Sequence, residues 1–224
     1  MIITICCEKG GAGKSSIAQA LSVFLKMDKR NVCLVDSDPQ KTSKEWADER
    51  LDNSQLPIPC MELTGRTRDD LRYFDGDDKI LVVDCGGADS LAMRSALSVS
   101  HIALLPFRPK RRDLRTAVKM ADIIETALLN NPNMVVRSVI TQAPTLPSQH
   151  KRITSAKSVL DSLGLNPLEH YTRNLNCWDD AEEYGLSILE YTEDKKGADD
   201  ANGVFNELFE NITLPIDNNS KEDK

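Results

Sequence analysis

The chain has 224 residues, of which 40% are hydrophobic and 28% are charged, and its formal net charge is −7. This composition is that of an ordinary soluble globular protein, and the length suits one large α/β domain. The acidic balance excludes a protein coated in nucleic-acid-binding charge, so any DNA contact requires a local basic cluster. The sequence has no apolar run of membrane-spanning length and opens directly with a strand pattern, from which we expect a cytoplasmic protein.

Short apolar runs alternate with helical patterns along the chain. Nearly continuous hydrophobicity predicts strands over Ile2–Cys7, Val32–Asp36, Ile80–Asp84, Ile102–Pro106 and Val135–Thr141. Apolar spacing of about 3.6 residues predicts helices over Ile17–Leu25, Leu114–Leu129 and Val204–Ile212. The alternation predicts an α/β fold, with a doubly wound, mostly parallel sheet and helices on both faces. Ligands of such sheets bind at the carboxyl ends of the strands.

A glycine-rich loop joins the first predicted strand to a helix that begins near Lys14. It reads Glu8-Lys9-Gly10-Gly11-Ala12-Gly13-Lys14-Ser15-Ser16. Glycines allow a tight turn whose N–H groups point at phosphate oxygens, and the helix adds its positive dipole end. Lys14 can reach the β- and γ-phosphates, and the Ser15 hydroxyl can ligate Mg²⁺. The pattern predicts a nucleoside triphosphate site, with Glu8 in place of the usual first glycine.

Two further predicted strands end in carboxylates. One ends in Asp36-Ser37-Asp38-Pro39-Gln40, and the next ends in Asp84-Cys85-Gly86-Gly87. Carboxylates at strand tips facing a phosphate loop suit the ligation of Mg²⁺ and the positioning of an attacking water. Asp84 follows four apolar residues, which is the Walker B form, and the two glycines after it let the backbone approach the γ-phosphate. Asp and Pro also favour ordinary turns. The position of both motifs after the phosphate loop in the chain favours the nucleotide-site interpretation over simple turns.

Taken together, these motifs resemble the deviant Walker ATPases of the ParA kind, a group that includes MinD, nitrogenase iron protein and the arsenite-pump ATPase. The matching segments are Lys9–Ser15, Asp36–Gln40, Val83–Asp84, the turn Leu105–Pro109 and a looser stretch over Tyr171–Ile188. The resemblance covers residues 1–212, which we expect to form one ATPase domain, followed by a disordered polar tail over residues 213–224. A chain that starts at its first strand resembles the small, ParF-like type without an N-terminal helix-turn-helix domain.

The resemblance implies that ATP and Mg²⁺ are bound in a homodimer that sandwiches two nucleotides. Lys9 would be the signature lysine that reaches the phosphates of the partner subunit, because two facing triphosphates need extra positive charge. Lys14 would act on the phosphates of its own subunit, and Asp38 would orient the attacking water.

The resemblance also implies the remaining nucleotide contacts. Ser15, Asp36 and Asp84 would hold the Mg²⁺ shell. The serine pair Ser15-Ser16 replaces the commoner Thr-Thr and keeps the hydroxyl ligand. Pro109, Thr141 and Gln142 would flank the adenine.

Proteins of this kind position DNA or other cargo by ATP-dependent, sequence-independent binding to the nucleoid, and a ParB-like adaptor stimulates their slow hydrolysis. Such binding needs a basic surface, and the chain has two local clusters. They comprise Arg108, Lys110, Arg111, Arg112 and Arg115, and then Lys151, Arg152 and Lys157. The resemblance favours Lys151 and Arg152 as DNA contacts, although a charge run is more often a solvated face.

Three other functions stay open at this point. A MinD-like membrane ATPase needs a basic amphipathic C-terminal helix, whereas acidic residues flank Val204–Ile212. An iron–sulfur protein needs paired or interfacial cysteines, and Cys85 is the one cysteine of the six that lies near the γ-phosphate loop. A module that binds ATP without hydrolysing it is compatible with Glu8 and the serine pair. The nature of the cargo, whether a plasmid, a chromosome or a protein assembly, is not encoded in these motifs.

Overall fold

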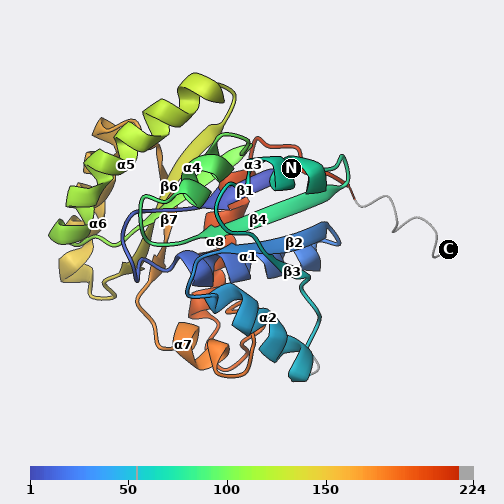
Figure 1. Ribbon diagram of the computed structural model, residues 1–224. Coiled ribbons are helices and arrows are strands. Elements are labelled where there is room, and N and C mark those ends of the chain that lie inside the picture. The colour runs from blue at the N-terminus through green and yellow to red at the C-terminus, as the bar shows by residue number, and fades with distance from the viewer. Residues whose placement is uncertain (54, 217–224) are drawn as a thin grey trace.

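The computed structural model describes residues 1–53 and 55–216. These residues build a seven-stranded sheet in the order β3-β2-β4-β1-β5-β6-β7, in which every neighbouring pair of strands is parallel (Figure 1). The strands are β1 (Ile2–Ile5), β2 (Asn31–Ser37), β3 (Cys60–Glu62), β4 (Lys79–Cys85), β5 (Ile102–Phe107), β6 (Val135–Ala143) and β7 (Pro167–Arg173). The predicted α/β fold with a parallel sheet is confirmed.

Helices cover both faces of this sheet (Figure 1). One face carries α1 (Lys14–Met27), α2 (Thr42–Asp52), α7 (Cys177–Glu182) and α8 (Lys196–Phe209). The other face carries α3 (Arg68–Phe74), α4 (Leu91–Leu97), α5 (Arg111–Asn130) and α6 (His150–Ser162), which follows a short 3-10 turn over Pro147–Gln149. Among the described residues, no helix is both long and apolar enough to cross a bilayer.

The central strands are apolar over most of their length, as suits strands with both faces covered by helices. In β4, Ile80 and Val82 pack toward α1, whereas Leu81 and Val83 pack toward α4 and α5, and all four side chains are 0% exposed. Such strands read as continuous hydrophobic runs, which is why β1, β2, β4, β5 and β6 are recognisable from the sequence.

The two edge strands and several boundaries differ from the prediction. β3 has only three residues, and β7 alternates buried Leu168 and Thr172 with exposed Glu169 and His170, so neither forms an apolar run. β1 ends at Ile5, because the chain then turns into the glycine-rich loop. The predicted C-terminal helix begins earlier, at Lys196, and ends before Ile212.

The predicted disordered tail begins too early. Leu214 packs against the α1 side of the core, and Arg30 Nη1 donates to the carbonyl oxygens of Leu214 at 3.4 Å and Pro215 at 2.8 Å. Residues 213–216 are therefore held against the body of the protein. The rest of the predicted tail, residues 217–224, lies outside the described residues.

The strand order places a crevice at the carboxyl end of β1. From β1 the chain moves to β2 and β3 on one side of the sheet, and later to β5, β6 and β7 on the other side. Ligands of doubly wound sheets bind where the direction of winding reverses, because the flanking loops diverge there. The glycine-rich loop follows β1 and therefore occupies this crevice.

Candidate functional site

The backbone of the glycine-rich loop is shaped to receive an anion. Gly11 and Gly13 have φ values of 70° and 80°, which lie in the left-handed region that favours glycine. Gly13 is the N-cap of α1 and has no side chain that could cap the helix. The N–H groups of the first turn therefore stay open for a phosphate. Lys14 is only 6% exposed, and its Nζ donates to the carbonyl oxygen of Lys9 at 3.2 Å, which folds the ammonium over the loop.

Two side chains of β6 hold the loop in this shape. Thr141 Oγ1 donates to the carbonyl oxygen of Ala12 at 2.7 Å, and Gln142 Nε2 donates to that of Gly11 at 3.0 Å. Gln142 itself has a φ of 48°, unusual for a residue with a side chain, where the β6–β7 pairing shifts register. Strained backbone of this kind concentrates at functional sites. Because these bonds engage the loop carbonyls, the loop N–H groups are left for phosphate oxygens.

Asp84 offers the oxygen that a metal ion needs. The residue is 0% exposed at the end of β4, and its Oδ2 accepts a hydrogen bond from Ser43 Oγ at 2.8 Å. Its Oδ1 is buried without a partner among the described residues. Burial raises the pKa of Asp84 to about 7, against a lowering by the hydroxyls of Ser15 and Ser43. A partnerless carboxylate oxygen beside a serine hydroxyl fits Mg²⁺, which prefers hard oxygen ligands.

Both carboxylate oxygens of Asp36 accept hydrogen bonds from the backbone. Its Oδ1 accepts from the N–H of Asp38 at 2.9 Å, and its Oδ2 accepts from the N–H of Lys44 at 2.8 Å. Burial raises the pKa of Asp36, and these backbone hydrogen bonds lower it. Both oxygens are engaged in holding the turn that leads into α2. Among the described residues, Asp84 has a carboxylate oxygen without a hydrogen-bond partner, whereas each oxygen of Asp36 already accepts one hydrogen bond; the role of Asp36 in the metal shell stays a prediction.

A cavity of about 600 Å³ lies between the loop and these acidic strand ends. Its walls include Lys14, Ser15, Asp38 and the Gly86-Gly87 segment. A Cβ on Gly87 would come within 3.0 Å of the Cα and N of Gly10 and within 3.3 Å of Lys14 Nζ. The segment after β4 thus lies directly against the phosphate loop, with no room for a side chain. The predicted phosphate and water-positioning residues are brought together in one cavity.

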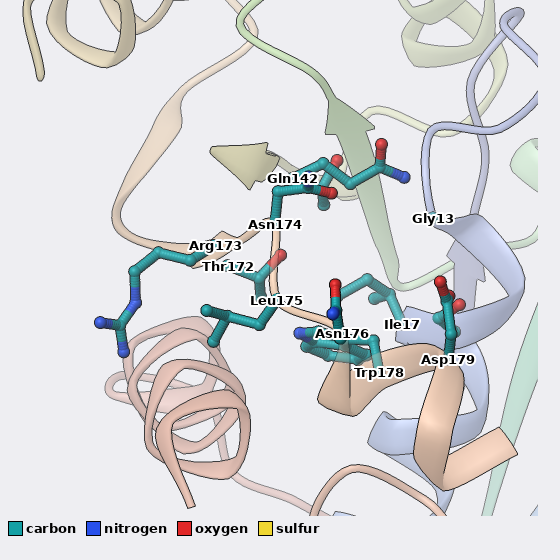
Figure 2. Close-up of a pocket in the computed structure, with 12 residues that line it drawn as sticks. Gly13, Ile17, Gln142, Thr172, Arg173, Asn174, Leu175, Asn176, Trp178 and Asp179 are labelled. Atoms are coloured by element: carbon teal, nitrogen blue, oxygen red, sulfur yellow. The ribbon is translucent and has the colours of Figure 1, made fainter. Parts of the chain in front are cut away.

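A second cavity of about 240 Å³ extends from the same loop toward β7 and α7 (Figure 2). The two cavities share Gly13, Ser16 and Gln142, so they are continuous. The remaining walls are Ile17, Thr141, Thr172, Arg173, Asn174, Leu175, Asn176, Trp178 and Asp179. Its position beside the phosphate cavity suits the base and ribose of a nucleotide.

The sequence located Thr141 and Gln142 in this second cavity but missed the wall after β7. That wall carries no nucleotide motif, and the signal that could have found it is its place at the carboxyl end of a strand. Ser16 Oγ donates to Glu182 Oε1 at 2.7 Å, which ties α7 to the start of α1. This bond holds the wall formed by Trp178 and Asp179 over the cavity.

Pro109 does not line the nucleotide cavities. It lies on the face of the sheet that carries α5 and α6, whereas the cavity walls come from α1 and α7 on the opposite face. Pro109 thus lines the groove between α5 and α6 and neither of these two cavities, and its contact with the adenine stays a prediction.

The two basic clusters converge on one surface. An open groove of about 830 Å³ between α5 and α6 is lined by Pro109, Lys110, Arg111, Leu114, Arg115, Val118, Lys151, Arg152, Ser155, Ala156 and Val159. We call it the basic groove. Arg112 is exposed on α5 outside it. Arg108 instead forms an ion pair with Asp113 and lies beside Gly11.

Lys157, the third residue of the second cluster, does not line the basic groove. Its Nζ donates to the carbonyl and carboxylate oxygens of Glu169 and lies 5.7 Å from the centroid of the Tyr171 ring. Its charge is therefore already paired, in contrast to Lys151 and Arg152, which are exposed and make no ion pair with any residue that the structure describes.

Residues 3–215 match the family described as CobQ/CobB/MinD/ParA nucleotide binding domain. The chain belongs to this family. The "Maintenance of carboxysome distribution protein A" of Halothiobacillus neapolitanus is 26% identical over 205 residues, which cover 90% of this chain and 93% of that protein. "Protein ParA" of Rhizobium radiobacter is 27% identical over 127 residues, or 55% of each chain. The solved structure of the septum site-determining protein MinD from Pyrococcus horikoshii, complexed with Mg-ADP, has a TM-score of 0.72 at 18% identity, over 96% of this chain and 99% of that one.

Two loop residues bear on how this member of the MinD/ParA family works. Glu8, which replaces the usual first glycine, forms an ion pair with Lys119 of α5 and so turns away from the phosphate cavity. Lys9 is exposed at the tip of the loop, and no hydrogen bond or ion pair ties its ammonium to the described residues. Cys85 is buried, and burial raises the pKa of its thiol well above the usual range.

Proposed function

We propose that the protein is an Mg²⁺-dependent ATPase whose ATP-bound dimer positions cargo on DNA. The observation that carries the ATPase part is Oδ1 of Asp84, which is buried close to Ser15 and Lys14 and has no hydrogen-bond partner among the described residues. A buried acceptor without a partner is costly unless a ligand satisfies it. The relation to the MinD/ParA family and the Mg-ADP complex of the archaeal MinD support the same ligands.

Each residue of the phosphate cavity has a role in the proposed hydrolysis. The loop N–H groups and Lys14 bind the β- and γ-phosphate oxygens. Ser15 and Asp84 hold Mg²⁺, which neutralises charge on these oxygens. Asp38 accepts a hydrogen bond from a water and orients its oxygen toward the γ-phosphorus. The new bond from water to phosphorus replaces the bond to the β–γ bridging oxygen, which gives ADP and inorganic phosphate.

Dimerisation is proposed to depend on Lys9. Its free ammonium lies at the exposed tip of the loop, where a second subunit could present its triphosphate. Two triphosphates that face one another repel, and a lysine from each subunit lowers that repulsion. A partner adaptor is proposed to speed the slow hydrolysis and so reset the dimer to monomers.

Nonspecific DNA is proposed to bind at the basic groove, which would associate the dimer with the nucleoid. Lys110, Arg111 and Arg115 of the first cluster and Lys151 and Arg152 of the second line this groove, in spite of the net charge of −7. A surface that neutralises phosphates needs no base contacts and weakens with salt. A membrane role has less support, because Val204, Phe205 and Leu208 of α8 are buried in the core and are not free for a bilayer.

The cargo can be DNA or a protein assembly, because the relatives include both a ParA protein and a carboxysome distribution protein. The identity of the adaptor decides between these cargoes. The ATPase residues described above would be the same in either case.

Light scattering after size-exclusion chromatography, with ATP, Mg²⁺ and a nonspecific duplex at two salt concentrations, tests the proposal. Wild type and Lys26→Ala, a change at the far end of α1, should dimerise and bind the duplex at low salt, whereas Lys9→Ala should stay monomeric. A wild-type dimer that ignores DNA at both salt concentrations would exclude positioning on the nucleoid and favour a protein surface as the track.

A further inference from the structure

The basic groove has a feature that phosphate binding leaves unexplained. Its rim carries cations from both helices, among them Arg111, Arg115 and Lys151, and none of the three forms an ion pair within residues 1–53 and 55–216. Its floor is apolar, and Val118 and Val159 remain 54% and 39% exposed there. A DNA backbone pairs with the rim but gives the valines no apolar partner.

The spacing of these residues matches one stripe on each helix. Arg111, Arg115 and Val118 follow one another at steps of four and three residues along α5, with Leu114 next to Arg115, and Arg152, Ala156 and Val159 do the same along α6. Each stripe is about two helical turns long, or roughly 10 Å. The groove therefore has the length of a contact with about two turns of a helix.

The electrostatics of the groove select for acidic groups. Since β5 and β6 are parallel, α5 and α6 run in the same direction and bring their positive N-terminal ends to the same edge of the sheet. Neither N-terminus has a side-chain cap. The remainder of the chain is acidic and repels an acidic partner, so the attraction is concentrated at this groove.

We propose that the basic groove docks an acidic amphipathic helix of a partner protein, and that this helix competes there with DNA. The proposal deepens the proposed function, on which it rests, by naming the chemistry of the adaptor segment. Apolar residues of the helix cover Val118 and Val159, while Asp and Glu on its flanks pair with Arg111, Arg115 and Lys151. Docking of the partner then displaces DNA from the groove directly, in addition to the reset by hydrolysis proposed above.

The probe is a fluorescein-labelled helical peptide of about fourteen residues, with leucines on one face and glutamates on the others. The control is a scrambled peptide of the same composition. Fluorescence anisotropy measures the binding of each peptide and of a duplex. The floor variant combines Val118→Ser with Val159→Ser, the rim variant combines Arg111→Ala with Lys151→Ala, and Leu129→Ser on the exposed end of α5 is the control.

The patterned peptide should bind wild type and the control variant at least about tenfold more tightly than the scrambled peptide. The floor variant should lose about tenfold in peptide affinity and keep its duplex affinity, whereas the rim variant should lose both. Unlabelled patterned peptide should displace the duplex from wild type.

Three outcomes overturn the proposal. Equal affinity for the two peptides, or no binding of either, means that the groove binds polyanions by charge alone. An equal loss of duplex affinity in the floor variant means that DNA uses the valines. Self-association of the chain that the floor variant abolishes means that the occupant is a second copy. The experiment distinguishes failure of the docking proposal from failure of the proposed function. If the peptide binds but the protein neither binds the duplex nor hydrolyses ATP, only the proposed function is refuted.

Discussion

Asp84 lies at the end of β4 with one carboxylate oxygen bonded to Ser43 and the other buried without a partner among the described residues. Burial raises its pKa to about 7, because the charged form is poorly solvated there. Under the proposed function, a bound Mg²⁺ would supply the missing interaction. The buried Asp84 carboxylate thus destabilises the fold without ligand, and a bound ligand would offset that cost.

Asp84→Asn is expected to lower ATP turnover by about 100-fold or more, because the neutral amide is a poor ligand for Mg²⁺. Above pH 7 and without Mg²⁺, the same variant should melt at the wild-type temperature or higher, because it removes a buried charge. Phosphate release and thermal unfolding measure the two effects. Asp122→Asn, on the exposed side of α5, should change neither. Unchanged turnover with a lower melting temperature would show that Asp84 is only structural.

Gly87 is the second residue at which local space decides function. A Cβ there would stand 3.0 Å from the backbone of Gly10, so Gly87→Ala must push the segment after β4 away from the phosphate loop. Turnover should fall by about tenfold, while the free energy of unfolding changes by about 1 kcal/mol or less. Gly76→Ala is the matched control for steady-state kinetics and urea unfolding, because a Cβ there would lie 3.5 Å from a side-chain oxygen of Asp78, an ordinary contact distance. Equal kinetics for the two variants would contradict the close approach.

At the scale of elements, α2 connects the metal-site residues to the segment after α7. Arg50 of α2 is 0% exposed, and its guanidinium donates to the carbonyl oxygens of Leu56 and Gly185 and to both carboxylate oxygens of Glu190, at 2.7 and 2.9 Å. Ser43, which holds Asp84, lies on the same helix. The placement of α2 therefore affects both stability and the site.

Arg50→Leu should lower the free energy of unfolding by about 3 kcal/mol, because it leaves the Glu190 carboxylate and the two carbonyl groups without their partner. Urea denaturation measures the loss. Lys44→Leu breaks the exposed pair of Lys44 with Asp48 on the same helix, and should cost about 0.5 kcal/mol or less. Similar losses in both variants would mean that the buried pair contributes no more than a surface pair.

His101 gives the junction of β1 and β5 a pH dependence. Its Nδ1 accepts a hydrogen bond from the N–H of Ile2 at 2.9 Å, which requires a neutral ring, and burial lowers the pKa of His101. In the unfolded chain, His101 binds a proton below the ordinary histidine pKa of about 6.5, whereas in the folded chain it does so only below its lowered pKa. Between these two pKa values, the free energy of unfolding therefore decreases as the pH falls.

His101→Asn should remove this dependence. The stability difference between wild type and the variant should shrink as the pH falls from 7 to about 5, measured by chemical denaturation at several pH values. The raised pKa values of Asp36, Asp84 and Glu182 make the folded state more stable as the pH falls, which is the opposite effect. These three residues are present in both proteins, so their contribution cancels in the stability difference. His150→Asn on α6 is the control, and a difference that is independent of pH would refute the assignment.

At the scale of the whole molecule, charge is distributed unevenly. The chain carries a net charge of −7, yet α5 and α6 present exposed cations from two sequence clusters in one groove. The same two helices close one face of the sheet, so the groove is built on a rigid core. Binding of a polyanion at this surface needs no rearrangement of the fold.

Arg111→Ala and Lys151→Ala should each weaken the binding of a nonspecific duplex several-fold at low salt and lower the salt slope by about 1. Lys157→Ala should have little effect, because Glu169 already pairs with that ammonium. Anisotropy titrations over a range of salt concentrations test this difference. An equal loss in all three variants would show that general charge, and not the groove, attracts DNA.

The sequence by itself determined the fold class and the phosphate cavity. The central strands are buried on both faces and therefore read as apolar runs, and the loop residues from Lys9 to Ser16 act within one continuous strand–turn–helix unit. Asp38 and Asp84 could be placed because they end parallel strands, which meet at one edge of the sheet. The sequence pattern was sufficient to predict these features because they depend on short continuous segments or on the repeated strand–helix unit.

Only the tertiary structure decided the features that depend on which elements lie side by side. The wall of Trp178 and Asp179 approaches the loop because α7 packs beside α1, and no local motif records that packing. Pro109 lies on the opposite face because α5 covers the other side of the sheet. Arg111 and Lys151 share a groove, and Lys157 leaves it, because the parallel order of β5, β6 and β7 places α5 beside α6 and Glu169 beside α6.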